Sequence, residues 1–186
     1  MIEWKEEEPD IKVLPWDKFP FDKLKIKTEQ FYQYIKDYNY IFFKKEAWEN
    51  MWNHGKSSYN EVGGLFIGYV YQYNNDFIWY IESIVYNNDL IHSTTHLILF
   101  PSLWQKANSL ILDNNGNPEK FIIGWYHTHP NFTPFFSITD QNTHKHFFNF
   151  DYSLGLVFDP FSERFTIYKG KEMELYKDKI KIIDLF

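Results

Sequence analysis

The chain has 186 residues, a formal net charge of −6, no cysteine and a hydrophobic share of 44%. This length predicts one domain with a short extension, and the apolar share excludes disorder throughout the chain. The negative charge disfavours binding led by nucleic-acid phosphates, and the lack of cysteine excludes disulfides, thiolate zinc sites and cysteine nucleophiles. The acidic N-terminus and the absence of a long apolar run predict a cytoplasmic protein with no membrane partner.

Residues 1–38 differ from the rest of the chain because prolines interrupt regular structure and aromatic residues lie scattered among charges. We expect this N-terminal extension to pack onto a domain at residues 39–186, with docking on a partner as the alternative. A short helix is expected at residues 29–37. The prolines and aromatic residues of the extension are Pro9, Pro15, Pro20, Trp4, Trp16, Phe19 and Phe21.

From residue 40 onward, apolar runs and helical patterns alternate. Asn74 and Asn75 tolerate the backbone of a tight hairpin, and Gly55 is expected to end a helix. Together the patterns predict a mixed α/β domain with helices packed against a largely antiparallel sheet. Helices are expected at residues 44–54, 101–112 and 137–148. Strands are expected at residues 40–43, 65–73, 77–86, 94–100, 121–127, 154–158, 164–168 and 171–176.

The residues most informative about chemistry are His127 and His129, followed by Ser137 and Asp140. The histidines lie two apart at a strand end, so both rings project from one face and can meet one ion. Asp140, in the first turn of the next helix, can supply a third ligand. Two imidazoles and one carboxylate suit Zn²⁺ and leave a fourth position for water, as in catalytic zinc sites. Alternatively, Ser137 and Asp140 form a helix-capping pair, a role that is compatible with ligation.

Around these residues the sequence resembles the JAMM metallopeptidases, also called JAB or MPN-plus domains, whose signature is an upstream Glu, H-[ST]-H-P and S-x-x-D. EVGGLFIGYV at residues 61–70 is similar to the family's Glu-containing segment, GWYHTHP at residues 124–130 to its GWYHSHP, and LGLVFDP at residues 154–160 to its next strand. The resemblance covers residues 40–176 and implies a single JAB/MPN-like domain of prokaryotic type. Asn131 replaces a common Gly, a change that we expect to be harmless because asparagine tolerates the left-handed conformation. The bulky FTPFF spacer is expected to reshape the substrate groove.

This resemblance implies that His127, His129 and Asp140 bind one Zn²⁺, that Glu61 is the catalytic base, and that Ser137 donates to the oxyanion. It further implies a zinc-dependent (iso)peptidase that cuts the amide bond after the C-terminus of ubiquitin or a ubiquitin-like protein, for deconjugation or precursor trimming. The alternative is a non-catalytic MPN scaffold that binds protein partners. A zinc nucleoside deaminase is disfavoured because its cysteine ligands are missing. The oligomeric state stays open.

Other candidates near the motif are weaker. His144 lies four residues after Asp140, so a bond to the metal ligands is conceivable, but a solvated helix face is the preferred interpretation. Trp125 and Tyr126 are expected to pack in the core rather than to contact substrate.

Overall fold

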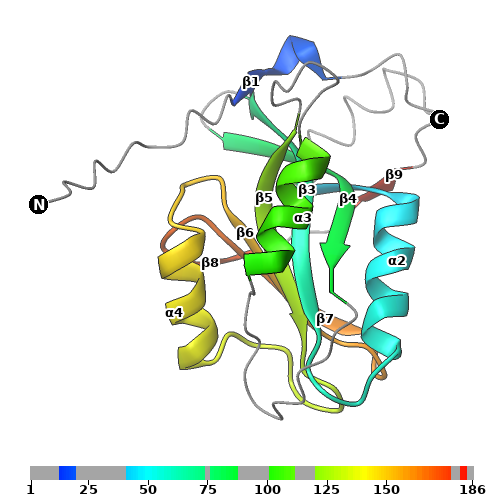
Figure 1. Cartoon of the computed structure of the whole chain (residues 1–186). Helices are drawn as coiled ribbons and strands as arrows, with labels where there is room; N and C mark the ends of the chain where they lie inside the picture. Colours follow the sequence, from blue (N-terminus) through cyan, green and yellow to red (C-terminus); the bar gives the residue numbers. More distant parts are fainter. Residues whose placement is uncertain are drawn as a thin grey trace, which may run out of the picture.

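The computed structural model describes residues 13–19, 41–73, 76–87, 101–111, 120–176 and 181–183. In these residues nine strands form one sheet, and three α-helices and a short 3₁₀ helix, η1 (Trp16–Lys18), accompany it (Figure 1). The helices are α2 (Lys45–Lys56), α3 (Pro101–Ile111) and α4 (Ile138–Phe147). The strands are β1 (Leu14–Pro15), β2 (Ile41–Lys44), β3 (Gly63–Tyr73), β4 (Asp76–Tyr86), β5 (Phe121–Thr128), β6 (Leu154–Asp159), β7 (Arg164–Lys169), β8 (Glu174–Tyr176) and β9 (Lys181–Ile183).

The strand order across the sheet is β8-β7-β6-β5-β3-β4-β2-β9, with β1 added beside one end of β3. Antiparallel ladders join β3 to β4 and to β5, and they also join β7 to β6 and to β8. The ladders β5–β6, β2–β4, β2–β9 and β1–β3 are parallel and shorter than the β3–β4 hairpin. The expected mixed, largely antiparallel sheet with flanking helices is confirmed.

Two hydrophobic cores lie on opposite faces of this sheet. Ala47 and Met51 of α2 are buried in one core together with Tyr126 of β5. Leu103 of α3 is buried in the other core together with Trp125 of β5. Because neighbouring residues of a strand point to opposite faces, β5 contributes large aromatic side chains to both cores. The strand that carries the first histidine is therefore held rigidly at the centre of the domain.

Several element boundaries differ from the expected ones. Gly55 does not end α2 but lies inside it, where a Cβ atom would come within 2.6 Å of the Phe158 ring, so the glycine allows close packing instead. The last expected strand begins only at Glu174, because Gly170 and Met173 adopt positive φ angles in the preceding turn. Strands β1 and β9 were not expected. The helix expected at residues 29–37 and the strand expected at residues 94–100 lie outside the described residues.

The described part of the N-terminal extension lies against the body of the sheet. Leu14 pairs in parallel with Tyr71, and Phe19 is only 3% exposed. The ring of Phe19 lies 5.1 Å from that of Tyr71 and 5.8 Å from that of Phe42. Trp4 and Phe21 lie outside the described residues. No helix in the described part of the chain is long and apolar enough to cross a bilayer.

Candidate metal centre

The end of β5 lies at the centre of the sheet, between β3 and β6. Strand β3 runs antiparallel to β5, and its first residue, Gly63, pairs with His127. Glu61 lies two residues before this pair, so the register brings it to the same end of the sheet as the histidines. Two hydrogen bonds fix this segment: the Thr128 amide donates to the Val62 carbonyl at 2.8 Å, and the Val62 amide donates to Thr128 Oγ1 at 2.9 Å.

The two histidines of the H-x-H motif are buried and converge on one point. Their Nε2 atoms lie 3.2 Å apart. The His129 amide donates to the Phe158 carbonyl at 2.9 Å, which extends the pairing of β5 with β6 by one residue. Both rings therefore project from the same face at the strand end, in agreement with their two-residue spacing.

Asp140 reaches the same point because Ser137 caps α4. The Asp140 amide donates to Ser137 Oγ at 3.2 Å and the Ser137 amide donates to Asp140 Oδ2 at 2.7 Å, which is a reciprocal capping box. Ser137 Oγ also donates to Oδ2 at 2.6 Å. The other oxygen, Oδ1, lies 3.3 Å from Nε2 of His127. The capping interpretation is thus correct, and the cap also orients the carboxylate toward the histidines.

The protonation states of Asp140 and His129 suit metal binding. Burial alone would raise the pKa of Asp140, but hydrogen bonding to His127 and Ser137 outweighs it and lowers the pKa to about 2. Burial and the neighbouring His127 lower the pKa of His129, against the opposite effect of the nearby carboxylates. At neutral pH the site therefore contains an ionised carboxylate and a neutral His129, the forms that ligate metal ions.

The spacing of the donor atoms can be compared with that of a tetrahedral zinc site. Zinc–ligand bonds of about 2.0–2.1 Å place neighbouring ligand atoms roughly 3.3–3.5 Å apart. The Nε2 atoms are 3.2 Å apart, His127 Nε2 is 3.3 Å from Asp140 Oδ1, and His129 Nε2 is 3.7 Å from Asp140 Oδ2. The His-His-Asp group can therefore hold one metal ion. Oε1 of Glu61 lies 3.7 Å from His129 Nε2, at the edge of this group.

A cavity of about 400 Å³ opens over the group. Exposed aromatic side chains line its edge, and we call Tyr59, Phe132 and Phe135 the aromatic rim. Tyr59 stacks on Phe161 with ring centroids 4.9 Å apart, and Phe132 and Phe135 lie 5.9 Å apart. Two members of the rim come from the bulky spacer after the H-x-H motif, so this spacer does shape the cavity beside the metal-binding group.

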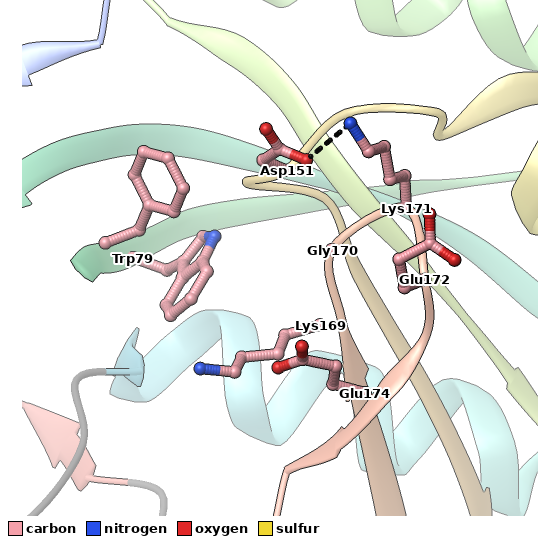
Figure 2. A pocket seen from close by; sticks show the side chains of 8 residues that line it. Trp79, Asp151, Lys169, Gly170, Lys171, Glu172 and Glu174 are labelled. Carbon is pink, nitrogen blue, oxygen red and sulfur yellow. Dashed lines mark ion pairs between the residues drawn. The ribbon is translucent and has the colours of Figure 1, made fainter. Parts of the chain in front are cut away.

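A second cavity, of about 240 Å³, lies away from this group, against β4 and the turn between β7 and β8 (Figure 2). Phe77 and Trp79 line it together with charged side chains, among which Asp151 and Lys171 form an ion pair of 3.1 Å. Its described lining contains no histidine and does not reach the H-x-H motif. The candidate site is therefore the first cavity.

The preferred interpretation of His144 was wrong. Its side chain is fully buried, not solvated, and its Nδ1 accepts a hydrogen bond from Trp125 Nε1 at 3.1 Å. Its Nε2 lies 3.0 Å from the Gly170 carbonyl oxygen. The sequence feature that could have predicted this burial is the spacing of four residues between Asp140 and His144, which places both side chains on the same face of α4. Trp125 and Tyr126 are buried in the core, as expected.

The mixed sheet carries an H-x-H motif at the end of a central strand, and a capped helix supplies an aspartate. These features are those of a JAB/MPN-type domain with a group of residues that can hold a metal ion. Comparison with known proteins agrees with this class. The family model described as "JAB1/Mov34/MPN/PAD-1 ubiquitin protease" matches residues 36–152. The chain belongs to this family.

The fold also occurs in a solved structure. Protein DSY2949 from Desulfitobacterium hafniense superimposes with a TM-score of 0.56 at 21% sequence identity, over 77% of this chain and 93% of that chain. This likeness supports the fold alone. A search of curated proteins gave no match.

Proposed function

We propose that the protein is a zinc-dependent (iso)peptidase that hydrolyses the amide bond after the C-terminus of ubiquitin or a ubiquitin-like protein. The observation that carries this proposal is the convergence of His127, His129 and Asp140 on one point beside Glu61, at the floor of an open cavity. Family membership supports the same chemistry. Deconjugation of modified proteins and trimming of a precursor tail both fit such a site.

His127, His129 and Asp140 would hold the zinc, which when bound activates water as a nucleophile and polarises the substrate carbonyl. The capping box leaves little freedom to the Asp140 carboxylate, because two groups of Ser137 donate to its Oδ2. Ligand preorganisation of this kind lowers the cost of ordering the site when the metal binds.

Glu61 would serve as the base. Its Oε1 lies 3.7 Å from His129 Nε2, so the carboxylate is beside the donor atoms of the His-His-Asp group without belonging to that group. Its carboxylate would take a proton from the water and deliver it to the leaving amine nitrogen.

Ser137 would donate a hydrogen bond to the oxyanion of the tetrahedral intermediate. In the structure its hydroxyl proton is directed to Asp140 Oδ2, so the hydroxyl must rotate away from the carboxylate to act on substrate. The hydrogen bond from the Ser137 amide to Oδ2, which is 2.7 Å long in the structure, does not involve the hydroxyl and would remain available to hold the carboxylate.

The alternative is a scaffold that binds partners without catalysis. A scaffold does not require a base beside a metal-binding group, whereas this cavity is lined by Glu61, Ser137, Asp140 and His129. The cavity is open and flanked by the aromatic rim, which suits an extended tail with apolar side chains. These features favour the peptidase.

The test is a cleavage assay on a panel of ubiquitin-like proteins, each carrying a reporter amine after its C-terminal residue in a linear or an isopeptide linkage. The variant Glu61→Gln should lower kcat by about 10²–10⁴-fold, because it removes the base but no zinc ligand. Its zinc content should equal that of the wild type. The matched control is Glu49→Gln, which changes an exposed carboxylate on α2 and should cleave normally.

Two outcomes would count against the proposal. A Glu61→Gln variant as active as the wild type would refute the role of Glu61 as base. A zinc-loaded wild type that cleaves no member of the panel would favour the scaffold.

A further inference from the structure

The two histidines of the H-x-H motif are held in different ways. Nδ1 of His129, the nitrogen that faces away from the cluster, lies 3.4 Å from the Thr133 carbonyl oxygen. Nδ1 of His127 is buried and has no hydrogen-bond partner among the described residues. A metal-binding histidine usually donates its second N–H to a carboxylate or a carbonyl, which fixes the plane of the ring. The plane of His127 must therefore be fixed by other contacts.

Aromatic packing takes the place of that hydrogen bond. The Trp125 indole stacks on the His127 ring with centroids 4.8 Å apart and an angle of 13° between the planes. Phe136 also contacts His127, with centroids 5.8 Å apart. Stacking restrains the tilt of a ring, but it does so only if the stacking partner is itself held in place. The orientation of His127 therefore depends on what holds Trp125.

His144 holds Trp125. An indole N–H can only donate, so Nδ1 of His144 accepts the 3.1 Å hydrogen bond from Trp125 and its Nε2 carries the proton. That proton is donated to the Gly170 carbonyl at 3.0 Å. Gly170 lies in the turn between β7 and β8 (Figure 2) and has a φ of 71°. Its amide donates to the Ser153 carbonyl at 2.8 Å, so this turn is anchored in the body of the domain.

We propose that His144 is a positioning residue for the metal centre: it fixes the Trp125 indole, whose face sets the plane of His127 and so directs Nε2 at the metal. This inference rests on the zinc centre of the proposed function, but it concerns metal affinity and geometry rather than cleavage. His144 does not touch the metal-binding group in the described contacts. One hydrogen bond and one stacked pair link it to His127, and the ring of Phe136, 5.7 Å from His144 and 5.8 Å from His127, packs beside this link.

The experiment makes two measurements on the full chain. Chelator competition gives the zinc affinity, and the visible absorption spectrum of the Co²⁺-substituted protein reports the ligand geometry. Both are made at a temperature below the unfolding transition of each variant. His144→Leu removes the partner of the indole N–H. Trp125→Phe keeps an aromatic ring over His127 and removes the same hydrogen bond. Both variants should weaken zinc binding by about 10–100-fold and alter the Co²⁺ spectrum, which reports ligand geometry.

Three further variants separate positioning from general stability. Ile41→Ala creates a void in the opposite core, so it should lower the unfolding temperature and leave zinc affinity and the Co²⁺ spectrum unchanged. His144→Gln, whose amide can accept from Trp125 and donate to Gly170, should bind zinc more tightly than His144→Leu. The double variant of His144→Leu with Trp125→Phe should bind zinc about as tightly as whichever single variant binds it less tightly. Both changes break the same hydrogen bond between Trp125 and His144, so their effects should not add.

Wild-type zinc affinity and an unaltered Co²⁺ spectrum in His144→Leu and Trp125→Phe would overturn the inference. If His144→Leu fails to fold, Trp125→Phe still decides it by the same two measurements, because it removes the same hydrogen bond. A wild type that binds zinc but cleaves nothing would refute the proposed function and leave the positioning role intact.

Discussion

Phe19 provides a direct test of whether the N-terminal segment is part of the folded domain. Its ring is buried among three aromatic rings of the sheet, at centroid distances of 5.1 Å from Tyr71, 5.8 Å from Phe42 and 6.3 Å from Tyr80. The rest of the described extension consists of Val13, the short strand β1 and the helix η1. If the extension docks on the body, Phe19 is its main anchor.

The cost of Phe19→Ala can be worked out from this burial. A buried phenylalanine removes roughly 150–250 Å² from water, which at about 25 cal/mol per Å² corresponds to about 4–6 kcal/mol. A compact unfolded state already buries part of this area, so we expect a loss of about 3–5 kcal/mol, the usual range for this substitution in a core. In a domain of this size each kcal/mol lowers Tm by roughly 2–4 °C, so Tm should fall by about 6–20 °C.

Thermal unfolding followed by circular dichroism measures this shift, with Asp17→Ala as the control because Asp17 is exposed on η1. Deletion of residues 1–38 should lower Tm by at least as much. The cleavage rate of the folded variants should be unchanged. A Phe19→Ala protein that melts like the wild type would refute docking. A stable truncated protein with reduced kcat/KM on protein substrates, but not on a tail peptide, would indicate a substrate contact instead.

Two smaller predictions concern the loop and the core beside the site. Asn131 has a φ of 59°, so Asn131→Gly should be nearly neutral and Asn131→Val should cost about 1–2 kcal/mol in urea unfolding; equal midpoints for the two variants would contradict this. Burial lowers the pKa of His54 to about 4 from 6.5. The folded state resists protonation of His54, whereas the unfolded state does not. The free energy of unfolding therefore falls as the pH drops from 6.5 toward 4, by at most about 3 kcal/mol. His54→Gln should reduce this pH dependence, and an unchanged slope would refute the assignment to His54.

Much of the candidate site follows from local rules that a sequence displays. The period of two along a strand places His127 and His129 on one face, and the S-x-x-D spacing places Asp140 in the first turn of a helix. The left-handed conformation of Asn131 also agrees with the expectation that asparagine tolerates it. Each of these relations joins residues only a few positions apart.

The features that were missed depend on contacts between residues distant in sequence. Strand β1 pairs with β3 and strand β9 with β2, and such short segments carry no pattern of their own. Gly55 lies inside its helix, at a place where Phe158, on another strand, leaves no room for a side chain. His144 is buried because Trp125 and the turn at Gly170 meet it there. None of these partners can be inferred from the local sequence.

The assignment of His127, His129 and Asp140 as a zinc-binding group is tested by the zinc content of the purified full chain. This content is measured by elemental analysis after dialysis against metal-free buffer. We expect about one zinc per chain in the wild type and in His146→Ala, which alters an exposed histidine of α4. The double variant of His127→Ala with His129→Ala should retain almost none. Zinc content unchanged in this double variant, or a wild type that binds no zinc when it is supplied, would contradict the assignment of the metal centre.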